Sequence, residues 1–178
     1  MAETLTRFNV KISVNALKTN PLDIEGTNST ILQSQTYSFT HGTGANQANQ
    51  FWSDNRNLGA TTADNLDLSG SLVSSLGVGA TILFAKIKAI IVFHDTPAAT
   101  AHMKVGGHAT LALATMFNGT PNLDTAQSSL NVVPGGCLAL VAPDAAGYTV
   151  TAGTEDMLTI YNGGASAIDY RIIILGTV

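Results

Sequence analysis

Charged residues are scarce in this chain of 178 residues, at 11% of the sequence against 45% hydrophobic residues. A typical soluble domain carries about 25% charged residues, and these help to keep its surface in water. Mean hydropathy is correspondingly high, at +0.23. The shortage of charge therefore indicates that other subunits cover part of the surface.

Long apolar runs are also missing. The longest candidate, ILFAKIKAIIVF at 82–93, is interrupted by Lys86 and Lys88, and it falls short of the roughly 20 residues that a membrane-spanning helix needs. The start, MAETLTRFNVK, has no basic region followed by an apolar stretch, so we expect no secretory signal, and we expect the protein to fold in a cytoplasm. We expect no membrane partner.

Basic clusters and cysteine pairs are absent as well. The eight Lys and Arg residues are scattered and the net charge is −4, which argues against a nucleic-acid surface. The single cysteine, Cys137, excludes an internal disulfide framework. We interpret it as a small buried hydrophobe, because no sequence feature places a base beside it.

Motifs that carry catalysis are not found. The chain contains no G-x-S-x-G, P-loop, H-E-x-x-H or EF-hand pattern. The four histidines, His41, His94, His102 and His108, lack metal-ligand spacing and are expected at the surface and at loop ends. Aromatic residues are only 6% of the chain, which is poor for a sugar-binding cleft. We therefore predict no catalytic residue, cofactor or metal, and no enzymatic activity.

What the sequence does contain is alternation with a period of two residues, the pattern of half-buried strands. In the segment 85–93 it places Ile87, Ala89 and Ile91 on one face, and in the last segment it aligns Ile168, Tyr170, Ile172 and Ile174. Glycine-rich turns separate the segments, and IYNGGASAIDY reads as a hairpin that joins the last two strands. Helical turns are possible at 45–51 and 110–116. We predict an all-β fold, a jelly-roll-like β-sandwich or barrel.

The first part of the chain differs from the rest. It holds one alternating strand, Phe8 to Val14, and then Pro21 and a polar stretch. We predict that residues 1–30 form an N-terminal arm or docking strand, and that residues 31–178 form a single β-sandwich domain. A lone strand must pair with some sheet edge, and we favour the edge of a neighbouring subunit.

The stretch GTGANQANQFWSDNRNL at 42–58 is the least regular part of the chain. Its Asn and Gln side chains suit a long loop whose backbone cannot join a sheet, and Trp52 would anchor that loop. Asp54 and Arg56 could pair with each other or hold neighbouring backbone groups. We predict a structural loop, packed on the sandwich or on a neighbouring subunit, with a ligand loop as the alternative.

The order of motifs resembles a family of small virion structural proteins encoded by tailed phages and prophages. The matching pieces, which fall within 42–178, are GTGANQANQFWSDNRNL, NLDLSGSL, FAKIKAIIV, KVGG, VPGG, LVAPDAAGYTVTAGTEDMLTIYNGG and YRIIILG. The resemblance implies a component of the phage particle and carries over no catalytic motif.

From these features we expect a capsid cement or decoration protein. It would form a homo-oligomer, with a trimer favoured by analogy, and would bridge copies of the major capsid protein on the capsid surface of the virion. The alternatives are a tail, head-closure or fibre component, and a receptor-binding or carbohydrate-binding module. Copy number per particle would separate a cement from a tail component.

Overall fold

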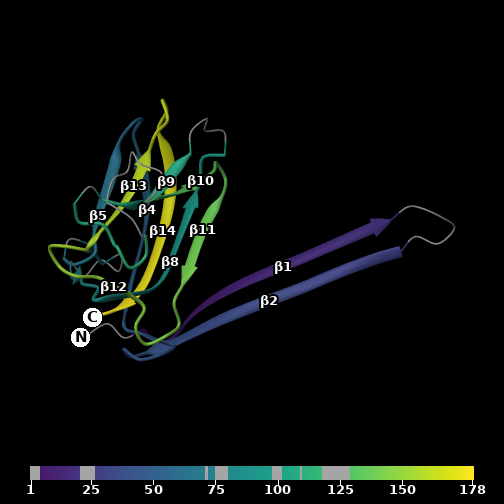
Figure 1. The fold of residues 1–178 in the computed structure, drawn as a ribbon, viewed down its shortest axis with the longest axis horizontal. Coiled ribbons are helices and arrows are strands. Elements are labelled where there is room, and N and C mark those ends of the chain that lie inside the picture. The colour runs from purple at the N-terminus through teal and green to yellow at the C-terminus, as the bar shows by residue number, and fades with distance from the viewer. Residues whose placement is uncertain are drawn as a thin grey trace.

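The computed structural model describes residues 5–20, 27–70, 72–74, 80–97, 102–108, 110–117 and 129–178. Over these ranges the protein is all-β: two sheets face each other as a sandwich, and a long two-stranded hairpin projects from one end (Figure 1). The predicted all-β fold is confirmed. None of the described segments forms a helix of the length and apolar character that crossing a bilayer requires.

The first sheet, here called the arm-side sheet, has the strand order β11-β8-β14-β4, with β12 added to β8. The second, the far sheet, has the order β10-β9-β13-β5. Most consecutive strands alternate between the two sheets, which is compatible with a jelly roll. The strand bounds are β4 Gln50–Leu58, β5 Ala63–Asp67, β6 Leu72–Val73, β7 Thr81–Ile82, β8 Lys86–His94, β9 Met103–Gly107, β10 Ser129–Val132, β11 Cys137–Val141, β12 Tyr148–Thr149, β13 Met157–Asn162 and β14 Ile168–Thr177.

The core lies between the two sheets. The central strand β14 pairs with β8 on one side and with β4 on the other, and its inward positions include Tyr170, Ile172 and Ile174, all buried. From the far sheet, Leu158 and Ile160 of β13 meet them, also buried. Each fully buried aliphatic side chain contributes about 1.5–3 kcal/mol. The sandwich therefore has a core of its own.

Strand β8 departs from the predicted alternation. The sequence pattern placed Ile87, Ala89 and Ile91 on one face, but Ile87 lies in the core between the sheets whereas Ala89 packs in a second cluster on the opposite face. The register of β14 against β8 shifts at Leu175/Gly176. This β-bulge puts an extra residue into one strand and reverses which side chains point inward.

The last two strands do not form the predicted hairpin. β13 belongs to the far sheet and β14 to the arm-side sheet, so the segment between them crosses from one sheet to the other. Asn162, fully buried, holds this crossover: its amide nitrogen donates to the carbonyls of Gly59 at 2.9 Å and Ser166 at 2.8 Å. Its side-chain oxygen accepts from the backbone N–H of Gly164 at 2.9 Å. The turn residues between two strands are the same whether the strands pair in a hairpin or lie in different sheets, so the sequence could not distinguish the two arrangements.

The two segments with possible helical turns also differ from expectation. Residues 45–51 contain a turn, then β3 (Gln47–Ala48) and the start of β4. In 110–116 the chain makes turns, with the backbone N–H of Phe117 bonded to the carbonyl of Leu113 at 3.0 Å. A single i to i+4 bond of this kind is one turn and not a helix.

The projecting hairpin consists of β1 (Phe8–Asn20) and β2 (Thr27–His41), which pair antiparallel from Phe8↔Phe39 to Asn20↔Thr27. We call it the arm. The predicted N-terminal strand therefore pairs within its own chain, and the arm runs past residue 30 to His41. Residues 35–40 thus belong to the arm and not to the sandwich. A short alternating pattern looks the same in a hairpin and in a domain sheet.

Candidate interaction surface

Trp52, Asp54 and Arg56 lie on strand β4 and not in a long loop, so that part of the prediction is wrong. The tight turn before the strand has positive φ at Asn46, 54°, and the chain then pairs with β14 along its whole length. Polar residues occur on both faces of β4, so the sequence shows no clean alternation. Pairing with an apolar neighbour overrides the weak intrinsic preference of such a segment.

Trp52 points into the sandwich and is buried. Its indole N–H donates to the backbone carbonyl of Val73 at 3.1 Å, which satisfies the only polar group on the ring. The tryptophan thus ties β4 to the segment that contains β6. It anchors the structure, as predicted, although from a strand.

Asp54 and Arg56 do pair, with the Arg56 Nη1 to Asp54 Oδ2 distance at 3.0 Å. A second carboxylate is closer: Arg56 Nε lies 2.6 Å from Asp64 Oδ2 on β5 of the far sheet. The Tyr170 hydroxyl also donates to Asp64 Oδ2, at 2.6 Å. Asp64 therefore links the two sheets through partners on β4 and β14. No local pattern predicts this contact, because Asp64 is distant along the chain from Tyr170.

Electrostatics in this cluster favour a neutral tyrosine beside a charged pair. Burial of Tyr170 and its hydrogen bond to Asp64 raise the pKa of the phenol well above its usual value. Burial would lower the pKa of Arg56, but its neighbours Asp64, Tyr170 and Asp54 together outweigh burial, and the pKa of Arg56 is raised. Tyr170 thus stays neutral and Arg56 stays charged at neutral pH. The cluster therefore forms a cross-link between the two sheets.

The outward face of the arm-side sheet is a different surface. Strand pairing arranges it in rows, of which the row Val141–Ala89–Leu175–Phe51 lies under the base of the arm. Two further rows run across the sheet beyond it: Ala139–Ile91–Ile173–Ser53 and Cys137–Phe93–Arg171–Asn55. We call these two rows the open rows.

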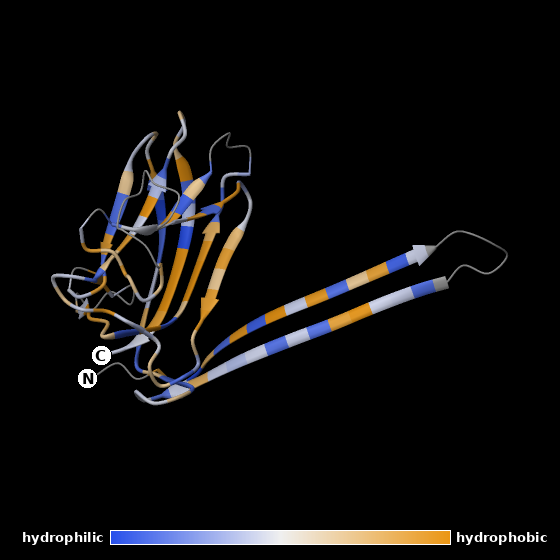
Figure 2. Ribbon diagram, in the orientation of Figure 1, coloured by the Kyte–Doolittle hydropathy of each residue, from blue (hydrophilic) through white to orange (hydrophobic). Residues whose placement is uncertain are grey.

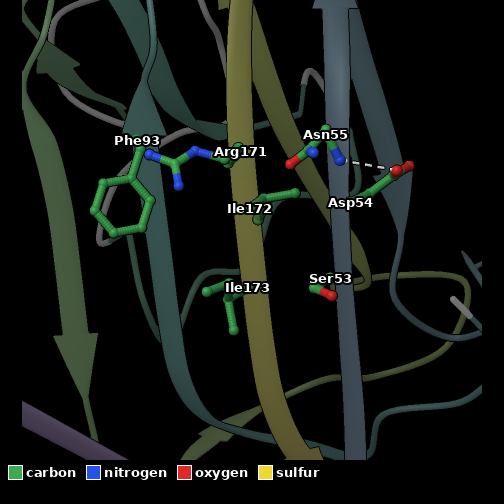
Figure 3. Close-up of a pocket in the computed structure, with 7 residues that line it drawn as sticks. All are labelled: Ser53, Asp54, Asn55, Phe93, Arg171, Ile172 and Ile173. Carbon is green, nitrogen blue, oxygen red and sulfur yellow. Dashed lines mark hydrogen bonds between the residues drawn. The ribbon is translucent and has the colours of Figure 1, made fainter.

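A shallow depression of about 360 Å³ lies on this face, between β4, β14 and β8 (Figure 3). Arg171 spans part of it: its guanidinium stacks on the Phe93 ring at 4.7 Å and makes a two-pronged contact with Asp95, at 2.6 and 2.9 Å. The hydrogen bonds between them lower the pKa of Asp95 and raise that of Arg171. Because Asp95 already neutralises Arg171, the depression is suited to contact with another protein surface and not to binding an anion.

Exposure of Cys137 contradicts the sequence analysis, which expected a buried side chain. Cys137 and Ala139 are both exposed on β11, and Ile91 and Ile173 are only partly buried. β11 lies at the end of its sheet, and no segment of the described chain covers its outward side chains at the open rows. Small and apolar residues at such positions mark a surface that another molecule can cover.

The histidines show no common site. His94 lies at the end of β8, as expected, but it is buried there, and its Nδ1 accepts from the backbone N–H of Thr96 at 3.3 Å. His108 caps a turn through the N–H groups of Thr110 and Leu111, whereas His41 and His102 are exposed. Within the part of the chain that the structure describes, no group of three or more His, Cys, Asp or Glu side chains could hold a metal ion.

The arm leaves the body at the outward face of the arm-side sheet. Its base is anchored there: Val10 and Phe39 are buried against Ala89 and Leu175. Beyond the base the two strands extend away from the sandwich, and apolar residues continue along them (Figure 2). The described protein thus presents two surfaces with partly exposed apolar residues: the distal arm, and the open rows, where Ala139, Ile91 and Ile173 lie beside polar residues.

Comparison with known proteins identifies no relative: no family model, curated protein or solved structure matches this chain.

Proposed function

We propose that this protein is a structural component of a tailed-phage particle, a cement or decoration protein that binds the major capsid protein as a homo-oligomer. The observation that carries the proposal is the arm, which extends apolar side chains away from a sandwich that already has its own core. Such an element adds little to the folding of its own domain. Its natural use is in assembly.

An isolated two-stranded hairpin is marginally stable in water. Among its described residues, the arm contacts the sandwich only at its base, through Val10, Phe39 and their neighbours, so its distal part gains stability when another surface covers it. A capsid shell offers many copies of such a surface to a cement protein. Contacts that are individually small give strong binding when each subunit is held at several points.

The resemblance to virion proteins supports the location on a particle, and the low charge content supports extensive contact with other subunits. A trimer is favoured by analogy with the joints between capsid subunits. The alternative particle roles differ from a cement in stoichiometry: a cement is present in hundreds of copies, and a tail or collar component in far fewer.

The test uses a variant with a shortened arm. Ser13 and Ser34 face each other in the hairpin, so residues 14–33 can be replaced with Asn-Gly, a two-residue turn that suits a hairpin. The anchor around Val10 and Phe39 remains. We expect an unchanged melting temperature of the body, to within a few degrees, and a large loss of occupancy on particles that lack the full-length protein.

Two results would contradict the proposal. Full occupancy of the shortened variant would remove the arm from the function. A count of only a handful of copies per particle for the full-length protein would replace the cement with a tail or head-closure component. Purified particles that contain none of the protein would exclude both the cement role and the tail or head-closure role.

A further inference from the structure

We propose that the distal arm of one copy packs, through one defined face, on the open rows of a second copy, so that copies close into a ring. The inference goes beyond the proposed function because it concerns contacts between copies of this chain, and it holds whether or not a particle is present.

The two faces of the arm differ. Side chains opposite each other in the hairpin share a face, so the face whose base is packed on the sandwich carries Ile12, Val14, Ala16 and Ile31, together with Gln33, Gln35 and Ser29. Of these, Ile12, Val14 and Ile31 are 45%, 54% and 53% exposed. We call this the anchored face. The opposite face is mostly Ser, Thr and Asn, with Leu17 and Leu32 as its two large apolar residues.

The anchored face already matches this surface of the protein. At its base, Val10 and Phe39 pack on Ala89 and Leu175, one row below the open rows. The distal part of the same stripe diverges from the body in Figure 1, so it leaves the open rows of its own chain uncovered. The arm of a second copy can make the same type of contact one row further along the sheet. There its apolar side chains would pack on Ala139, Ile91 and Ile173.

Charge and spacing agree with this docking. The described strands β1 and β2 carry Lys11 and Lys18 and no acidic residue. Lys18 lies on the anchored face, four residues beyond Val14. On the sheet, Asp169 lies on the outward face four residues before Ile173, and its carboxylate accepts from the Asn57 amide at 2.7 Å. Both intervals are about 13 Å in extended chain, so Val14 over Ile91, the β8 partner of Ile173, brings Lys18 within reach of Asp169 and leaves β1 beside Cys137 on β11.

The area of the contact explains why a closed assembly is needed. The distal arm from Ile12 to Asn20 is about 30 Å long and two strands wide, so one face offers roughly 300 Å², and docking covers a similar area of the receiving sheet. One contact of about 600 Å² is small for a specific complex, which buries about 1,200–2,000 Å². In a ring each copy gives one arm and receives one, so two contacts hold it, and the combined area reaches that range.

A first experiment compares matched charge substitutions in purified protein without particles. Val14→Asp lies on the anchored face and Leu17→Asp on the other, and both positions are well exposed, at 54% and 64%. We expect both variants to keep the circular dichroism and melting temperature of the parent. Sedimentation should show loss of the oligomer for Val14→Asp and an intact oligomer for Leu17→Asp.

The receiving surface is tested by Ala139→Glu, an exposed position in an open row beside Ile91. This variant should also lose the oligomer while its fold is unchanged. A monomeric parent protein overturns the proposal, and so does equal sensitivity of the two arm faces, which would indicate pairing through strand edges. An oligomer that survives Ala139→Glu overturns the assignment of the open rows.

A second experiment uses Cys137, the single native cysteine, as a reporter in the open rows. New cysteines are placed one at a time on the anchored face, as Ile12→Cys, Val14→Cys and Ala16→Cys, with Leu17→Cys as the control. Disulfides form only when the two Cα atoms come within about 7 Å. We expect disulfide-linked oligomers for at least one anchored-face variant and for none on the opposite face, with Cys137 as the partner in peptide mass spectrometry. A disulfide within one chain would show that the arm folds back on its own body, and would overturn the proposal. These outcomes do not depend on occupancy of a particle.

Discussion

At the scale of single residues, Trp52 shows how a polar-looking segment is held in the structure. Its ring is buried between the sheets and its N–H has a backbone partner at Val73. We predict that Trp52→Ala lowers the free energy of unfolding by about 3–5 kcal/mol. Trp52→Phe keeps most of the apolar contact and loses one hydrogen bond, so it should cost clearly less. Urea titration followed by circular dichroism measures both. Equal small losses would mean that the ring is not packed.

The Asp64 cluster gives the second prediction at this scale. Arg56 contacts both Asp54 and Asp64, but Asp54 is exposed and Asp64 is partly buried and shared with Tyr170. Coupling in a double-mutant cycle should therefore be larger for Arg56 with Asp64, about 1 kcal/mol or more, than for Arg56 with Asp54, about 0.2–1 kcal/mol. The measurement is unfolding free energy of the single and double alanine variants. The reverse order would show that the cross-link between sheets is not formed.

At the scale of elements, the inward faces of the arm-side sheet carry the fold. Ile87 of β8 and Ile172 of β14 are fully buried in the core. Asp at either position places an unpaired charge in an apolar interior, and we predict loss of folded protein. Asn55→Asp, at an exposed position of the neighbouring strand β4, should change stability by less than about 0.5 kcal/mol. Soluble Ile172→Asp with unchanged melting would mean that the strand faces are reversed.

The bulge between β14 and β8 depends on Gly176. A Cβ at this position would lie 2.6 Å from a ring carbon of Phe84 and closer still to the backbone oxygen of Lys86. We predict that Gly176→Ala destabilises the protein by about 1–3 kcal/mol, because a strand has to move to make room. Gly70→Ala is the control, since its Cβ would make only an ordinary contact with Leu83 at 3.7 Å. Thermal melting compares the two, and equal melting temperatures would count against a tightly closed bulge.

At the scale of the whole molecule, the protein combines a packed sandwich with an arm that is anchored at one end. Local stability should follow that division, because backbone hydrogen bonds in a two-stranded ribbon open more easily than those of a central strand. We predict that amide hydrogens of β1 and β2 between Ile12 and Ile31 exchange faster than those of β14 in dilute protein. Assembly should slow the exchange of the arm selectively. Arm amides as protected as β14 in a dilute monomer would show that the arm needs no partner.

The amino-acid sequence by itself determined the class of fold. A period of two residues is a local property, because successive side chains of a strand point to opposite faces whatever the strand pairs with. The residues 168–174 were therefore placed correctly, with Tyr170, Ile172 and Ile174 on one face. The pairing of Asp54 with Arg56 was also among the expected alternatives, since two positions apart in a strand means the same face.

Only the tertiary structure decided which strands share a sheet and which surfaces stay open. Pairing is a contact between residues far apart along the chain, so alternation could not show that β1 pairs with β2, or that β13 and β14 lie in different sheets. The bulge at Leu175/Gly176, which reverses the face of Ile87, is equally invisible to a local pattern. Exposure of Cys137 on β11 followed from the position of that strand at the end of its sheet. A side chain is buried or exposed according to what covers it, and that depends on the arrangement of the whole chain.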